Sequence, residues 1–229
     1  MRRNKLFVST MMFAWCIAGA VVLTAIAQSN DPKAPGPGDM KLPPGWTEQD
    51  MQACMMAATP GPMHQQLAKN IGVWQGKNTM WMAPGTEPMK SDCVTTNAPI
   101  MDGRFLRSET TGDMPGMGPF TGFAVYGFDN VSKKFQSTWI DNMGTGMMVG
   151  TGELSSDGRI LTWNFTYNCP IAKKAVTMRE IETITGPDTK LLEMWSTDPK
   201  SGKEYKMMEI AYTRKPGTAG TASIPTGTR

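Results

Sequence analysis

The sequence predicts a mainly β protein: a ten-stranded antiparallel up-and-down barrel preceded by one or two short N-terminal helices. From Val73 onward, short segments of strand-forming residues are separated by turn formers about every dozen positions. Long helical patterns do not interrupt these segments, which argues against the helix-connected parallel strands of an α/β fold. Consecutive short strands with tight turns favour a closed barrel, and a β-sandwich is the alternative.

Two short helices are expected before the first strand. Thr47 is followed three residues later by Asp50, a loose capping box, and apolar residues at helical spacing come next. Pro60-Gly61-Pro62 ends this helix. A second helix is predicted over residues 63–71, with Gly72 in the usual stop position.

The ten predicted strands follow in order. Separators such as Ser156-Asp157-Gly158 and Gly186-Pro187-Asp188 favour turns that let the next strand reverse direction. The predicted strands are residues 73–82, 89–97, 103–111, 119–128, 134–142, 146–154, 159–167, 175–185, 190–197 and 204–214.

Several of these segments carry apolar residues on both faces. In residues 204–214, Met207 and Ala211 would point to one face of the strand, whereas Met208 and Ile210 would point to the other. A flat sheet with one solvated face should alternate more cleanly between apolar and polar residues. The pattern therefore favours a barrel strand whose two sides are both partly apolar.

The first 27 residues predict a secretory signal and hence export to the periplasm or the cell exterior. Basic residues precede an apolar run from Leu6 to Ile26, and Ala25-Ile26-Ala27 offers a cleavage site before Gln28. An uncleaved membrane anchor is the alternative, because the run is about as long as a spanning helix needs. The membrane would then be a partner of this segment alone.

Removal of the signal changes the charge of the chain. The signal contains Arg2, Arg3 and Lys5, so the 23 basic residues fall to 20 and balance the 20 acidic residues. A balanced chain offers no electrostatic attraction for nucleic acid, and no nucleic-acid partner is predicted. Residues 28–45 and 216–229 are rich in Pro and Gly, and we expect a flexible linker and a disordered tail around a domain at residues 46–215.

Three cysteines remain after loss of the signal: Cys54, Cys93 and Cys169. An oxidising compartment would allow at most one internal pair. Cys93 with Cys169 is the candidate disulfide because both lie in the predicted barrel. Three free thiols are the alternative.

One short motif resembles a known group of barrels. Gly72-Val-Trp74-Gln-Gly76, which leads from a short helix into the first strand, resembles the calycins: lipocalins, fatty-acid-binding proteins and nitrobindin-like proteins. In those barrels, the Trp plugs the closed end. Further motifs in order, including Gly127-Phe-Asp-Asn130, Ser137-Thr-Trp-Ile-Asp-Asn-Met-Gly-Thr-Gly146 and Glu209-Ile-Ala-Tyr-Thr-Arg-Lys215, resemble the bacterial domain-of-unknown-function family number 1579 over residues 63–215. The resemblance implies a calycin-like barrel and no established activity.

Methionine is the unusual component of the composition. The chain has 21 Met, of which 18 remain without Met1, Met11 and Met12 of the signal. Met is flexible and apolar, so a Met-lined lumen adapts to varied apolar ligands. We expect the barrel to bind a small hydrophobic or amphipathic molecule without catalysis. The alternative is a structural or interaction module of the cell envelope whose lumen is packed shut.

Strand alternation gives candidate residues for the lumen, beginning from an inward Trp74. Residues of matching parity on the other strands extend the set. The charged members would need partners inside a barrel, and the alternative is that they lie outside on a solvated wall. The candidates are Trp74, Asn78, Met80, Met82, Arg107, Trp139, Asp141, Met178, Glu180, Met194, Trp195, Met207 and Glu209.

A copper site is a weaker hypothesis. Thioether ligands select Cu(I), and Met114 and Met117 lie on one loop with Met147 and Met148 as possible neighbours. Because many other Met residues lie in predicted strands, apolar lining is favoured, and no metal or other cofactor is predicted. His64, the single histidine, precedes the first strand, which argues against haem binding.

No motif identifies an enzyme. The sequence contains neither a Gly-x-Ser-x-Gly elbow nor a His-Glu-x-x-His helix. Glu180 and Glu182 share one strand face and could form an acid–base pair. The sequence therefore leans towards a binding protein and leaves an enzyme as an alternative.

Overall fold

The structure, a computed structural model, describes residues 42–220. The predicted signal peptide lies outside this range, as do most of the predicted linker and the last residues of the predicted tail. Among the described residues, no helix combines the length and apolar character needed to cross a membrane.

Two helices precede the barrel, as predicted: α1 (Glu48–Ala58) and α2 (Pro62–Ala68). The capping box forms, because the Asp50 N–H donates to Thr47 Oγ1 (3.2 Å) and the Thr47 N–H donates to Asp50 Oδ2 (2.8 Å). None of the described residues of α1 is buried. In contrast, α2 buries His64 and Leu67.

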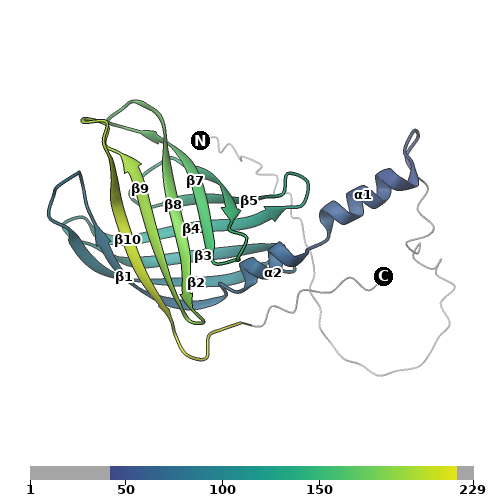
Figure 1. The fold of residues 1–229 in the computed structure, drawn as a ribbon, viewed down its shortest axis with the longest axis horizontal. Helices are drawn as coiled ribbons and strands as arrows, with labels where there is room; N and C mark the ends of the chain where they lie inside the picture. The colour runs from purple at the N-terminus through teal and green to yellow at the C-terminus, as the bar shows by residue number, and fades with distance from the viewer. Residues whose placement is uncertain (1–41, 221–229) are drawn as a thin grey trace, which may run out of the picture. The chain divides into compact units, whose positions relative to one another are not determined.

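Ten strands form a closed antiparallel barrel in which each strand pairs with the next and β1 pairs with β10 (Figure 1). The fold class predicted from the sequence is thus confirmed, with strand ends that differ from the prediction by at most three residues. The strands are β1 (Gly72–Met80), β2 (Met89–Ile100), β3 (Phe105–Met114), β4 (Gly118–Asp129), β5 (Lys134–Asp141), β6 (Met148–Leu154), β7 (Ile160–Cys169), β8 (Lys174–Gly186), β9 (Thr189–Thr197) and β10 (Glu204–Arg214).

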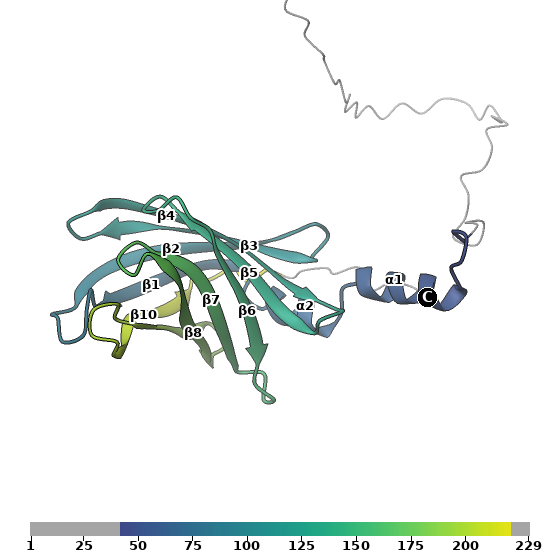
Figure 2. The same ribbon diagram turned by 90° about the horizontal axis from the view of Figure 1, so that it is seen from above.

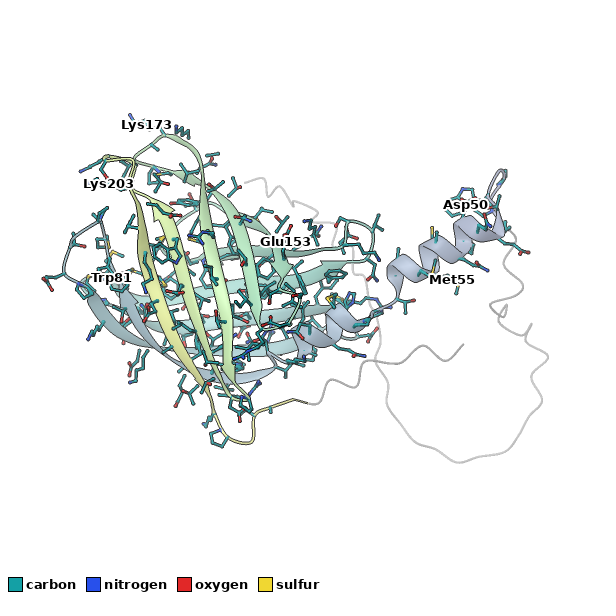
Figure 3. The ribbon with its side chains drawn as sticks, viewed as in Figure 1. Asp50, Met55, Trp81, Glu153, Lys173 and Lys203 are labelled. Atoms are coloured by element: carbon teal, nitrogen blue, oxygen red, sulfur yellow. The ribbon has the colours of Figure 1, made fainter. Side chains whose placement is uncertain are left out.

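Because the strands alternate in direction, the barrel has two different ends. At the helix end, where β1 begins, α2 contacts β3 and β4. The opposite end, here called the loop end, carries the connections at residues 81–88, 115–117, 142–147, 170–173 and 198–203. Figure 2 shows β3 and β4 running side by side along one wall, and the labelled Trp81, Lys173 and Lys203 mark the loop end in Figure 3.

An aromatic core fills the helix end beside β6 and β7. The Trp163 and Phe165 rings stack with centroids 5.8 Å apart, and Phe135 joins them. Their partners across the sheet are glycines: Gly152 faces Trp163 and Gly150 faces Phe165. A Cβ on Gly152 would lie 2.7 Å from the Trp163 ring, so the missing side chain gives the ring its place.

Residues that follow the barrel, which the sequence assigned to a disordered tail, contact the start of β1. Thr218 Oγ1 accepts a hydrogen bond from the Val73 N–H (3.1 Å), and the Lys215 N–H donates to the Val73 carbonyl (2.7 Å). The chain therefore stays against the start of β1 for several residues beyond the predicted domain end.

The structure does not contain the predicted Cys93–Cys169 disulfide. In the part of the chain that is described, Cys54, Cys93 and Cys169 are free thiols. Cys93 lies on β2 and Cys169 at the end of β7, and these strands are not neighbours in the barrel. The sequence could show that both cysteines belong to the barrel, but it could not show that their strands lie in different parts of the wall.

Candidate functional site

The barrel encloses a cavity of about 340 Å³ whose lining is mostly apolar. Its walls come from the strands, and Leu67 and Asn70 contribute from α2 and the residues after it. The cavity runs from Met residues near the loop end to a cluster of charged and amide groups near the helix end.

Trp74 lies beneath the cavity at the helix end. Its side chain is buried, and its Nε1 donates to the Asn70 carbonyl (2.8 Å). The Lys190 ammonium lies 4.8 Å from the centre of the indole and the Arg214 guanidinium 4.1 Å. These cation–π contacts and the hydrogen bond hold the indole in place at the helix end.

Methionines gather around the cavity at the loop end. They lie at the loop-end termini of β1, β3, β6 and β10 and in the connection between β5 and β6, and each lines the cavity: Met80, Met114, Met143, Met148, Met207 and Met208. Unbranched thioether side chains can repack around ligands of different shape. Trp139 adds a polar contact here, because its Nε1 donates to Asp141 Oδ2 (2.8 Å).

An ion pair lies at the helix end of the cavity. Lys190 Nζ donates to Glu182 Oε2 (2.8 Å) and to Asn70 Oδ1 (2.9 Å). The Lys190 and Glu182 side chains are only 8% and 14% exposed. The amide satisfies a second donor of the ammonium, which is what a buried ion pair requires.

Glu180 lies two residues before Glu182 on the same face of β8 and lines the same cavity. The residue is 5% exposed, and among residues 42–220 no hydrogen bond acts on its carboxyl group, since Lys190 pairs with Glu182 instead. Burial, reinforced by the Glu182 charge and opposed by Lys190, raises the pKa of Glu180 to about 8. At neutral pH, Glu180 is therefore mostly an uncharged carboxylic acid.

Hydroxyl and amide groups line the wall formed by β1, β2, β3 and β10. Thr95 Oγ1 shares hydrogen bonds with the hydroxyls of Thr110 (2.8 Å) and Tyr212 (3.2 Å). Asn97 Nδ2 donates to the Asn70 carbonyl (2.9 Å). The Oδ1 atoms of Asn97 and Asn78 are buried and have no partner in the described chain. Two acceptors of the lining are thus left for other donors.

Comparison with known proteins gives the family of this barrel. The sequence matches the family described as "Protein of unknown function (DUF1579)" over residues 59–214. The chain belongs to this family. The DUF1579 match covers α2 and all ten strands and confirms the predicted resemblance.

A solved structure supports the fold of this DUF1579 chain. It is similar to the crystal structure of Rv2717c from M. tuberculosis, with a TM-score of 0.53, 16% identity, and coverage of 68% of this chain and 98% of that one. At this identity the likeness concerns the fold alone. No curated protein matches the sequence.

Eight of the thirteen candidate lumen residues line the DUF1579 cavity. They lie on five different strands, and the barrel brings them together: Asn78, Met80, Trp139, Asp141, Met178, Glu180, Met194 and Met207. Alternation along each strand locates these side chains once the inward face of that strand is correctly assigned.

Three of the remaining candidates lie elsewhere for simple reasons. Trp74 is buried beneath the cavity and does not line it. Met82 follows the end of β1, where alternation no longer applies, and is 60% exposed. Arg107 faces outward, with Nε 3.4 Å from the Glu109 carboxylate.

Trp195 and Glu209 face outward because of local geometry. Met194 points into the cavity, so its neighbour Trp195 points out, and the Arg179 guanidinium lies 5.7 Å from its ring. A β-bulge between Lys206 and Met208 interrupts the alternation of β10. Met207 and Met208 both line the cavity as a result, and Glu209 forms an ion pair with Lys206 instead.

The polar residues at the helix end were missed as lumen candidates. Lys190 shares the parity of Leu192 and Met194 on β9, so alternation from Met194 would have located it. Glu182 follows from Glu180 in the same way. The contact between Lys190 and Asn70 joins residues 120 positions apart and has no signal in the local sequence.

The residues considered for copper or haem binding are spread over different environments. Met114 and Met148 line the cavity, whereas Met117 and Met147 are exposed. In residues 42–220, no group of three or more His, Cys, Asp and Glu side chains is placed to hold a metal ion. His64 is buried in α2, where its Nδ1 accepts from the Gly61 N–H (3.0 Å).

Proposed function

We propose that this barrel binds a small amphipathic molecule in its lumen and does so without catalysis. The cavity of about 340 Å³ carries the proposal, because it falls within the range of small-molecule sites, about 300–1,000 Å³. A structural module with a packed lumen would need no such space.

The two ends of the cavity support different parts of a ligand. The Met residues at the loop end suit an apolar portion of variable shape. Glu180, the Lys190–Glu182 ion pair and the Asn97 amide at the helix end suit a polar group. A mostly apolar pocket with a few fixed polar groups is typical of sites that orient their ligand.

Lumen binding is tested with a fluorescent probe and a pair of variants on one strand. We expect N-phenyl-1-naphthylamine to gain fluorescence with the unmodified protein and to lose at least about tenfold in affinity with Met148→Trp, because the indole would fill the cavity. Val149→Trp is the matched control, since Val149 is the next residue and is exposed on the outer face.

The probe experiment has two contrary results. Equal weakening by Met148→Trp and Val149→Trp would place the probe on the outer surface and contradict the proposal. Absence of any probe binding, together with clean protein in native mass spectrometry after purification from its own host, would also contradict it.

A further inference from the structure

We propose that the ligand of this cavity is a cationic amphiphile, an apolar molecule with one primary amine, whose ammonium group pairs with Glu180. This inference rests on the proposed function and specifies the chemical class of the ligand.

The charges that line the cavity are unequal. Three carboxyl groups on the inward face of their strands line it against a single ammonium group: Asp141, Glu180 and Glu182 against Lys190. An anionic ligand would meet a surplus of like charge, whereas a cation would reduce the imbalance.

Most of these carboxylates already have partners, and Glu180 does not. Lys190 pairs with Glu182 (2.8 Å). Asp141 accepts from the Trp139 indole (2.8 Å). The carboxylates of Asp92 and Asp113 are exposed on the outward face of their strands, where Asp92 pairs with Lys77 (2.7 Å). Among the inward-facing carboxyl groups of the described residues, Glu180 is thus the one without a hydrogen-bond or ion-pair partner.

Neighbouring groups from other strands leave the Glu180 charge uncompensated. Lys190 of β9 is the one cation facing it among the described residues, and its donors are directed to Glu182 and Asn70. Tyr126 of β4 and Tyr212 of β10 also face Glu180, and burial raises the pKa of both phenols well above the usual range. These phenols stay neutral at physiological pH, so in the described chain only a proton neutralises Glu180, and a cation that replaces this proton has to come from a ligand.

The surroundings of Glu180 suit an ammonium group. An ammonium has three donors and no acceptor, and the unpaired Oδ1 atoms of Asn97 and Asn78 belong to the same lining. Trp163 is the direct cross-strand partner of Glu180 and also lines the cavity. Aromatic faces attract cations, most strongly where water is excluded.

Binding of a protonated amine releases the proton of Glu180. The free protein carries this proton on the carboxyl oxygen at neutral pH, the ammonium keeps its own protons, and the carboxyl proton leaves to buffer as the ion pair forms. Burial raises the pKa of Glu180 to about 8, so each pH unit below that value weakens amine binding by about tenfold.

Three ligands with the same chain test the inference by isothermal titration calorimetry: n-octylamine, n-octanol and n-octanoate. We expect n-octylamine to bind at least about tenfold more tightly than n-octanol near pH 8, and n-octanoate to bind most weakly. Titration at pH 7 in buffers with different ionisation heats should show release of close to one proton per bound amine and none for n-octanol.

Glu180→Gln keeps the shape of the side chain and removes its charge. We expect this variant to retain n-octanol binding and to lose both the preference for n-octylamine and the proton release. Glu153→Gln is the matched control, because Glu153 lies on the outer wall, where it pairs with Lys134, and is labelled in Figure 3. It should leave all three affinities unchanged.

The outcomes separate this inference from the proposed function. Binding of n-octanol or n-octanoate as tight as that of n-octylamine would overturn the cationic ligand and still support lumen binding. If none of the three octyl ligands binds and the fluorescent probe does not bind either, both the cationic ligand and the proposed lumen binding are overturned. If Glu180→Gln does not fold, proton release by the unmodified protein decides: release of close to one proton supports the inference, and no release overturns it.

Discussion

At the scale of single residues, Glu180 couples stability to pH. The pKa of Glu180 is about 8 in the folded protein, against 4.5 for an ordinary glutamate. Between pH 4.5 and pH 8, the carboxyl group therefore keeps its proton in the folded state and has lost it in the unfolded state. Stability therefore falls as pH rises from about 4.5 to about 8, by up to about 1.4 kcal/mol per unit. Below about pH 4.5 both states are protonated, and Glu180 contributes no slope.

Glu180→Gln should remove this pH dependence. We expect the variant to be more stable than the unmodified protein by several kcal/mol at pH 8 and to differ little near pH 4.5. Urea unfolding at a series of pH values measures the difference. Two parallel stability curves would show that Glu180 titrates normally in the folded protein.

Lys190 has a separate structural role at the residue scale. Lys190→Met should cost about 3 kcal/mol of unfolding free energy, because it leaves Glu182 buried without its cation. Lys77→Met is the control: Lys77 pairs with Asp92 on the exposed surface, and its loss should cost less than about 1 kcal/mol. Equal losses in chemical denaturation would contradict the buried role of Lys190.

At the scale of elements, the strands could be predicted because local patterns specify them. Turn residues bound each segment, and all ten segments form. Whether a side chain points into the barrel or out of it could be predicted only where the alternation along the strand is unbroken. The bulge beside Met207 in β10 inserts one residue, and that single irregularity turns Glu209 outward.

The β6–β7 pair gives an element-scale prediction. Gly152→Ala should destabilise the barrel by about 1–3 kcal/mol, because the new Cβ would lie 2.7 Å from the Trp163 ring. Gly146→Ala should be close to neutral, since a Cβ there meets nothing within 4 Å. Thermal unfolding compares the two, and similar melting temperatures would contradict the close packing of glycine and indole.

At the scale of the whole molecule, closure of the barrel creates contacts that no local pattern contains. The Thr95–Tyr212 hydrogen bond joins residues 117 positions apart, and the Lys190–Asn70 contact spans 120. The sequence could therefore predict the barrel and much of its Met lining but not the polar network at the helix end. The same limit explains why the predicted Cys93–Cys169 disulfide was wrong, because assignment of two residues to one barrel does not place them on neighbouring strands.

Export is the remaining prediction for the whole chain. Cleavage after Ala27 would remove Arg2, Arg3 and Lys5 and leave a protein with balanced charge that begins at Gln28. We expect protein produced with its own leader in a bacterial host to show by intact mass spectrometry the mass of residues 28–229. Ala27→Leu should block cleavage because signal peptidases need a small residue there, whereas Ala20→Leu within the apolar run should not. Full-length protein in the membrane fraction, for the unmodified chain, would instead identify the segment as an uncleaved anchor.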